Sequence, residues 1–179
     1  MPGVLTEIPG LYTPAECRAL IALAESVGFA PAPIDPDFHG PQGFQAREGR
    51  DNHRAALHDE AIAAAIWTRA QRHVPAELQG RRAVGLNERL RFYRYDKGQS
   101  FAAHTDGYHR RDDGAQSLLT FMLYLNDGFE GGETVFEATA QSVRPVTGTA
   151  LVFAHQLWHA GRPITQGRKY VLRTDVMYA

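Results

Sequence analysis

The chain has 179 residues, the size of one domain, and a chain of this length buries roughly 70% of the surface that its unfolded form exposes. Its 19 basic side chains nearly balance 20 acidic ones, and the resulting net charge of −1 argues against a nucleic-acid partner. No segment approaches the roughly 20 consecutive apolar residues that span a bilayer, so no membrane partner is expected.

Cys17 is the only cysteine, so no disulfide bond can form within the chain. A lone cysteine in a predicted amphipathic helix is typical of a small buried hydrophobic residue. The first residues show neither the basic start nor the apolar run of a targeting signal. These features predict a protein of the reducing cytoplasm.

The first 82 residues contain two predicted helices and a long loop. A helix is predicted at residues 13–26, because a threonine, a proline and a glutamate stand at capping-box spacing from Thr13. A second helix is predicted at residues 59–74, where apolar residues recur at helical spacing. Between them, residues 31–54 are rich in proline and glycine without any period, which predicts a loop that serves as a lid over a site.

The sequence changes character after Arg82, where β-branched and aromatic residues become frequent and turns recur at short intervals. The predicted strands are residues 84–95, 101–104, 118–126, 133–136, 149–153 and 169–178. Two helices followed by such strands predict a mainly β fold, a double-stranded β-helix (jelly roll) with the N-terminal helices packed on one sheet. We expect one structural unit in which residues 1–82 support a core at residues 83–179.

Alternation along two predicted strands places large polar side chains on one face of each. Arg89, Arg91 and Tyr95 share a face of the first predicted strand, and Lys169 and Arg173 share a face of the last one. A solvated face is the ordinary explanation of such a pattern. A barrel with a polar cavity inside explains both strands, and it would let an arginine bind a substrate carboxylate or peptide carbonyl.

A candidate metal site is formed by His104, Asp106 and His159. The first two lie two positions apart at the end of a predicted strand, so their side chains can converge on one side of the chain. Two histidines and one carboxylate form the facial triad of non-haem iron(II) oxygenases. Three protein ligands leave three positions open, two for the keto oxygen and carboxylate of a 2-oxo acid and one for dioxygen.

A bound 2-oxo acid also needs a partner for its far carboxylate, because an unpaired charge is costly in a buried pocket. Lys169 begins the last predicted strand and can form this ion pair. The Tyr124 phenol or the Thr134 hydroxyl can add a neutral hydrogen bond.

His155 is the alternative third ligand. We favour His159 because Lys169 is correctly spaced from it, and we expect His155 to support the ligands or the packing of its loop. His109 is expected to be exposed, where it could contact a substrate. The other histidines are expected in helices or at the surface: His39, His53, His58 and His73.

Several elements occur together between Leu86 and Tyr178, about half of the chain. They are residues 95–106 (YDKGQSFAAHTD), 124–126 (YLN), 131–136 (GGETVF) and 145–148 (PVTG), with His159 and the Lys169-Tyr170 pair. In this combination they resemble the prolyl 4-hydroxylase branch of the 2-oxoglutarate/iron(II) dioxygenases. The double-stranded β-helix of that family agrees with the strand pattern.

The resemblance implies that the triad binds iron(II) and that Lys169 binds the distal carboxylate of 2-oxoglutarate. It also implies that three further residues lie near this co-substrate: Tyr95, Tyr124 and Thr134. In related enzymes L-ascorbate keeps the iron reduced, so ascorbate is a further expected cofactor.

Two positions depart from the family pattern. Ala160-Gly161 follows His159 where Glu-Gly is usual, and this change is expected to alter a turn rather than the metal site. Arg173 lies where many relatives carry a smaller residue. We expect it to add a second cation to the co-substrate or substrate pocket.

The expected reaction couples the oxidative decarboxylation of 2-oxoglutarate to hydroxylation of an unactivated C–H bond, with release of succinate and CO₂. The resemblance favours a prolyl residue of a peptide or protein as the substrate, and another side chain or a free small molecule is an alternative. A zinc-dependent hydrolase on a cupin-like barrel could use the same three ligands, but it leaves Lys169 without a role. A non-catalytic binding module is a third reading, against which the complete triad argues.

Overall fold

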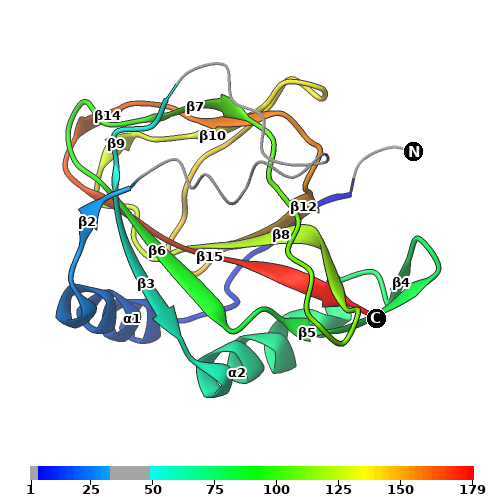
Figure 1. Ribbon diagram of the computed structural model, residues 1–179. Helices are drawn as coiled ribbons and strands as arrows, with labels where there is room; N and C mark the ends of the chain where they lie inside the picture. Colours follow the sequence, from blue (N-terminus) through cyan, green and yellow to red (C-terminus); the bar gives the residue numbers. More distant parts are fainter. Residues whose placement is uncertain (1–3, 33–48) are drawn as a thin grey trace.

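The computed structural model describes residues 4–32 and 49–179. Two antiparallel β-layers face each other, and the α-helices lie on the outer side of the larger layer (Figure 1). The mainly β, jelly-roll class predicted from the sequence is confirmed.

The larger layer is a nine-stranded sheet with the ten-residue strand β15 (Lys169–Tyr178) near its centre. Its main path runs in the order β1 (Leu5–Ile8), β12 (Ala150–Ala154), β8 (Gln116–Tyr124), β15, β6 (Arg89–Tyr95), β3 (His53–His58) and β2 (Ala30–Pro31). Off this path, β5 (Arg81–Leu86) pairs with β15, and β4 (Glu77–Leu78) pairs with β5.

The smaller layer is a four-stranded sheet that faces the centre of the large one (Figure 1). Its strands lie in the order β11 (Gln141–Val143), β10 (Thr134–Phe136), β13 (His159–Gly161) and β7 (Phe101–His104). A further pair is formed by β14 (Ile164–Gln166) and β9 (Glu130–Gly131). The smaller sheet thus joins segments that are nearly 60 residues apart in sequence.

The helices begin where their caps predict. Helix α1 (Pro14–Val27) has the complete Thr13–Glu16 capping box, with the Glu16 amide donating to the Thr13 hydroxyl at 3.3 Å. Helix α2 (Glu60–Ala70) begins after its N-cap Asp59 and continues into the 3-10 turn η2 (Gln71–His73). No helix of the described residues is long and apolar enough to cross a bilayer.

One predicted strand was wrong in its extent. Residues 84–95 form two strands, β5 and β6, because the side chain of Asn87 turns the chain between them by accepting a hydrogen bond from the Arg89 amide at 3.1 Å. The two strands then pair with different parts of β15.

Four strands before residue 84 were not predicted, namely β1, β2, β3 and β4. Strand β1 pairs with β12, while β3 pairs with β6 over six residues and β2 extends that edge. The predicted loop at 31–54 therefore contributes its two ends to the sheet. Its middle, residues 33–48, lies outside the described residues, and so does its predicted role as a lid.

Candidate functional site

Strand pairing in the smaller sheet brings two histidines together. His104 ends β7, His159 begins β13, and the two are register partners across this antiparallel pair. Asp106 lies just beyond β7, and its amide donates to the His155 carbonyl at 2.8 Å, which ties this loop to the turn after β12. The Asp106 carboxylate lies 3.8 Å from His104 Nε2 and 3.7 Å from His159 Nε2.

Both imidazoles are held in one orientation by the backbone. Nδ1 of His104 is 2.8 Å from the Ala102 carbonyl, and Nδ1 of His159 is 2.8 Å from the Leu157 carbonyl. A carbonyl oxygen can only accept, so each Nδ1 carries the hydrogen and each Nε2 presents a lone pair toward Asp106. Three possible ligand atoms of His104, Asp106 and His159 lie within 4.8 Å of one another.

The protonation states suit a divalent cation. Burial lowers the pKa of His104 to about 3 and also lowers the pKa of His159, so both imidazoles are neutral at pH 7. Burial alone would raise the pKa of Asp106, but the Arg173 guanidinium and the two imidazoles hold it well below its usual range. Two neutral nitrogens and an ionised carboxylate therefore converge, and this donor set fits iron(II).

Aromatic side chains surround the two histidines. The Phe101 ring stacks on His104 with centroids 3.6 Å apart, and the Phe153 ring meets His159 edge-on at 4.7 Å. These rings fix the imidazole planes and limit the access of water from that side.

The polar faces noted in the strand sequences line a cavity between the two sheets. Its wall includes residues from β6, β8 and β15 as well as the triad: Tyr93, Tyr95, Thr120, Met122, Lys169 and Arg173. The prediction of a barrel with a polar interior is thus confirmed by Tyr95, Lys169 and Arg173, whereas the solvated-face alternative holds for Arg89, which is exposed.

Lys169 lies in this cavity as a buried cation. Its side chain is almost fully buried, its Nζ donates to the Gly132 carbonyl at 2.6 Å, and it lies 5.4 Å from the ring centroids of Tyr95 and Tyr124. No carboxylate of residues 4–32 or 49–179 forms an ion pair with it. Burial accordingly lowers the pKa of Lys169 to about 7.

The phenols beside Lys169 remain protonated. Burial raises the pKa of Tyr95 and of Tyr124 above the ordinary value of a phenol. Tyr95 is the register partner of Lys169 on β6, and the Tyr124 hydroxyl lies 2.6 Å from the Thr134 hydroxyl. Each hydroxyl has one hydrogen, so after one is used between them the second can be donated to a ligand.

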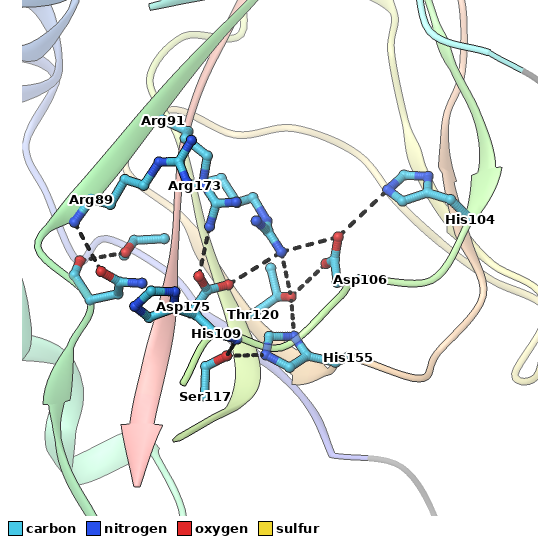
Figure 2. A network of polar contacts seen from close by, with 12 residues as sticks. Arg89, Arg91, His104, Asp106, His109, Ser117, Thr120, His155, Arg173 and Asp175 are labelled. Carbon is cyan, nitrogen blue, oxygen red and sulfur yellow. Dashed lines mark hydrogen bonds and ion pairs between the residues drawn. The ribbon is translucent and has the colours of Figure 1, made fainter. Parts of the chain in front are cut away.

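Arg173 reaches the cavity, but two carboxylates already contact it. Its Nη2 lies 3.1 Å from Asp106 and 3.2 Å from Asp175. Of the three arginines on β6, Arg91 is buried and pairs with Asp175, whereas Arg89 is exposed. Figure 2 shows Arg91, Asp175 and Arg173 in a row that leads to Asp106. A co-substrate contact of Arg173 stays a prediction.

His155 does not join the three clustered ligand atoms. Its Nδ1 lies 2.9 Å from the Thr120 hydroxyl and its Nε2 lies 2.9 Å from the Ser117 hydroxyl, so both ring nitrogens contact hydroxyls of β8 (Figure 2). His109 is exposed, and its amide donates to Ser117 at 2.8 Å.

The side chains at this site without a predicted role include Thr120, Ser117, Asp175 and Arg50. The first was recognisable, because Thr120 shares a strand face with Met122 and Tyr124, although its contact with Asp106 depends on the fold. Arg50 belonged to the predicted loop, yet its guanidinium lies 4.6 Å from the Tyr93 ring and 4.3 Å from the Phe101 ring. The segment around Arg50 has no regular sequence pattern from which this position could have been predicted.

Comparison with known proteins points in the same direction as the geometry. Residues 90–174 match the 2OG-Fe(II) oxygenase superfamily. A PKHD-type hydroxylase of Methylobacterium nodulans is 30% identical over 178 residues, which cover 93% of this chain and 75% of that protein. A putative prolyl 4-hydroxylase of Acanthamoeba polyphaga mimivirus is 40% identical over 68 residues, or 32% of this chain and 28% of that protein.

The fold recurs in a solved structure. The viral collagen prolyl hydroxylase of Paramecium Bursaria Chlorella virus-1, solved with 2OG, superposes with a TM-score of 0.67 at 23% identity. The superposition covers 98% of this chain and 96% of the viral one, so the whole two-layer arrangement is shared. The chain belongs to the 2OG-Fe(II) oxygenase superfamily.

Proposed function

We propose that this protein hydroxylates a C–H bond of a prolyl residue, or of another residue, in a peptide or protein. One oxygen atom of O₂ enters the C–H bond. The other oxidises 2-oxoglutarate, which loses its first carboxylate as CO₂ and becomes succinate. Bound iron(II) supplies the redox chemistry, and the protein supplies ligands, orientation and a shielded pocket.

The observation that carries the proposal is a cavity with two complementary features. The triad of His104, Asp106 and His159 lines it, and so does Lys169, a buried cation that has no carboxylate partner among the described residues. A hydrolytic zinc site requires no such cation. A dicarboxylate that contacts the metal at one end would place its other carboxylate against Lys169.

Three neutral groups complete the proposed co-substrate pocket. The Tyr124–Thr134 hydroxyl pair has one hydrogen left to donate to the distal carboxylate. Tyr95 packs beside the lysine ammonium and excludes water from the ion pair. The Gly132 carbonyl holds the ammonium in place before the ligand arrives. These residues would orient 2-oxoglutarate between Lys169 and the triad.

The choice of a peptidyl substrate rests on the names of relatives, a PKHD-type hydroxylase and a putative prolyl 4-hydroxylase. A free small molecule is the alternative that the test below separates. L-ascorbate as the reductant, and a reducing cytoplasm as the compartment, also belong to the proposal. Cys17 supports the compartment, since it is a free, buried thiol.

The test is oxygen-dependent turnover. Purified protein is incubated with iron(II), 2-oxoglutarate, ascorbate and a panel of proline-containing peptides and free metabolites. We expect succinate and a gain of one oxygen atom in the mass of one peptide, both dependent on O₂. Asp106→Ala should abolish both, because it removes a ligand, whereas Asp112→Ala, at an exposed loop position, should retain both.

Modification of a free metabolite alone would replace the peptidyl substrate by a small one. A product formed without oxygen, with the mass of added water, would overturn the oxygenase proposal itself.

A further inference from the structure

Both oxygens of the Asp106 carboxylate are held by side chains from the large sheet. The Thr120 hydroxyl donates to Oδ2 at 2.5 Å, and Arg173 Nη2 contacts Oδ1 at 3.1 Å (Figure 2). Asp106 itself follows β7 of the small sheet, so these contacts join the two layers through the carboxylate. A carboxylate held at both oxygens has little freedom to rotate.

The Arg173 contact is backed by a buried row of charges. Asp175 lies 3.2 Å from Arg173 and 2.6 Å from Arg91, and the four side chains from Asp106 to Arg91 are between 2% and 8% exposed. Arg173 and Arg91 are register partners on β15 and β6, so their like charges face each other with Asp175 between them. The row contains two positive and two negative charges, and loss of one would leave another uncompensated in the interior.

The Thr120 contact is backed by a hydrogen-bond chain with only one possible direction. The ionised Asp106 can only accept, so Thr120 uses its single hydrogen there and must accept from His155 Nδ1–H at 2.9 Å. A neutral imidazole with hydrogen on Nδ1 accepts at Nε2, where the Ser117 hydroxyl donates at 2.9 Å. Ser117 in turn accepts from the His109 amide at 2.8 Å.

We propose that Arg173 and Thr120 are positioning residues that preset the Asp106 carboxylate for metal binding, the first through Asp175 and Arg91 and the second through His155 and Ser117. This inference rests on the proposed function, because it takes Asp106 as a metal ligand. It gives a role to four residues of the site that do not belong to the proposed co-substrate pocket: Thr120, His155, Ser117 and Asp175. It also gives Arg173 a partner other than 2-oxoglutarate.

The proposal is tested with Co(II) as the probe, because its absorption spectrum reports coordination and its affinity can be measured without turnover. Thr120→Val removes the hydroxyl at nearly constant size. Arg173→Gln removes the positive charge. Arg173→Lys keeps a positive charge but lacks the planar guanidinium with its several N–H donors. Arg89→Gln is the matched control, an exposed arginine at the start of the strand that carries Arg91.

We expect the Co(II) affinity of Thr120→Val and of Arg173→Gln to fall by about 10- to 100-fold, with an altered visible spectrum. Arg173→Lys should recover part of the affinity, and Arg89→Gln should match the unmodified protein. If Arg173→Gln does not fold, as judged by circular dichroism, Thr120→Val and Thr120→Ser decide, and Thr120→Ser should retain the affinity because it keeps the hydroxyl.

Unchanged Co(II) affinity and spectrum in folded Thr120→Val and Arg173→Gln would overturn the proposal. The same holds if Arg173→Gln weakens 2-oxoglutarate binding alone, since Arg173 would then serve the co-substrate. Failure of the proposed function looks different: the unmodified protein and Asp106→Ala would bind Co(II) equally, or neither would bind it.

Discussion

Individual residues of this site suit ligand charges that the described part of the chain does not supply. Lys169 is buried against a carbonyl and two phenols, and its pKa falls to about 7 because burial disfavours the ammonium. A bound anion would raise this pKa again and favour the ammonium form. His104 and His159 are kept neutral by the same burial, which suits them to a cation.

The lowered pKa of Lys169 predicts that 2-oxoglutarate binding takes up a proton. Above pH 7 the free side chain is largely neutral, and the bound carboxylate favours its ammonium form, so a proton enters with the ligand. The apparent affinity should therefore fall as pH rises above about 7, by up to about tenfold per unit. Calorimetry of Mn(II)-loaded protein at pH 8, in buffers of different ionisation enthalpy, measures this uptake.

Lys169→Arg is the matched variant, because a guanidinium stays protonated at pH 8 and its binding heat should not depend on the buffer. Buffer-independent heat in the unmodified protein would show that Lys169 does not receive the carboxylate.

At the scale of elements, the ends of helices and strands were predicted best where the local sequence determines them. The Thr13 capping box fixes the start of α1, and β7 and β15 match their predicted ranges. Strand β3 escaped prediction because its sequence, HRAALH, has no β-branched residue and becomes a strand only by pairing with β6. Whether such a segment forms a strand depends on its pairing partner, which cannot be identified from the local sequence.

Gly148 shows how one turn joins two elements around the site. It has φ +80°, its carbonyl accepts from the Tyr12 amide before α1, and its amide donates to the Tyr124 carbonyl at the end of β8. A Cβ at this position would lie 1.9 Å from the Tyr12 carbonyl oxygen. We expect Gly148→Ala to lower the free energy of unfolding by about 2–5 kcal/mol, because left-handed strain and overpacking act together.

Urea unfolding followed by tryptophan fluorescence measures the effect. Gly114→Ala is the control, since Gly114 has φ +88° with nothing within 4 Å of a Cβ, and it should cost only about 1–2 kcal/mol of strain. If both variants lost the same free energy of unfolding, the close contact between the new Cβ and Tyr12 would contribute no destabilisation.

At the scale of the whole molecule, the site depends on two sheets that face each other (Figure 1). Side chains of both sheets line the cavity between them. The triad and Lys169 were identifiable from residue types and spacing, and the polar interior was identifiable from strand alternation. The supporting contacts were not, because Thr120, Ser117 and Asp175 reach Asp106 or its partners across strands distant in sequence. Sequence patterns therefore indicated the candidate ligands, and only the fold revealed the side chains that contact them.

The central claim, an iron(II) and 2-oxoglutarate site built on His104, Asp106 and His159, is tested most directly without oxygen. Iron(II) and 2-oxoglutarate are added anaerobically, and the visible absorption spectrum is recorded. We expect a weak charge-transfer band that requires both additions and is absent from Asp106→Ala. No band in the folded, unmodified protein, together with tight binding of zinc, would contradict it.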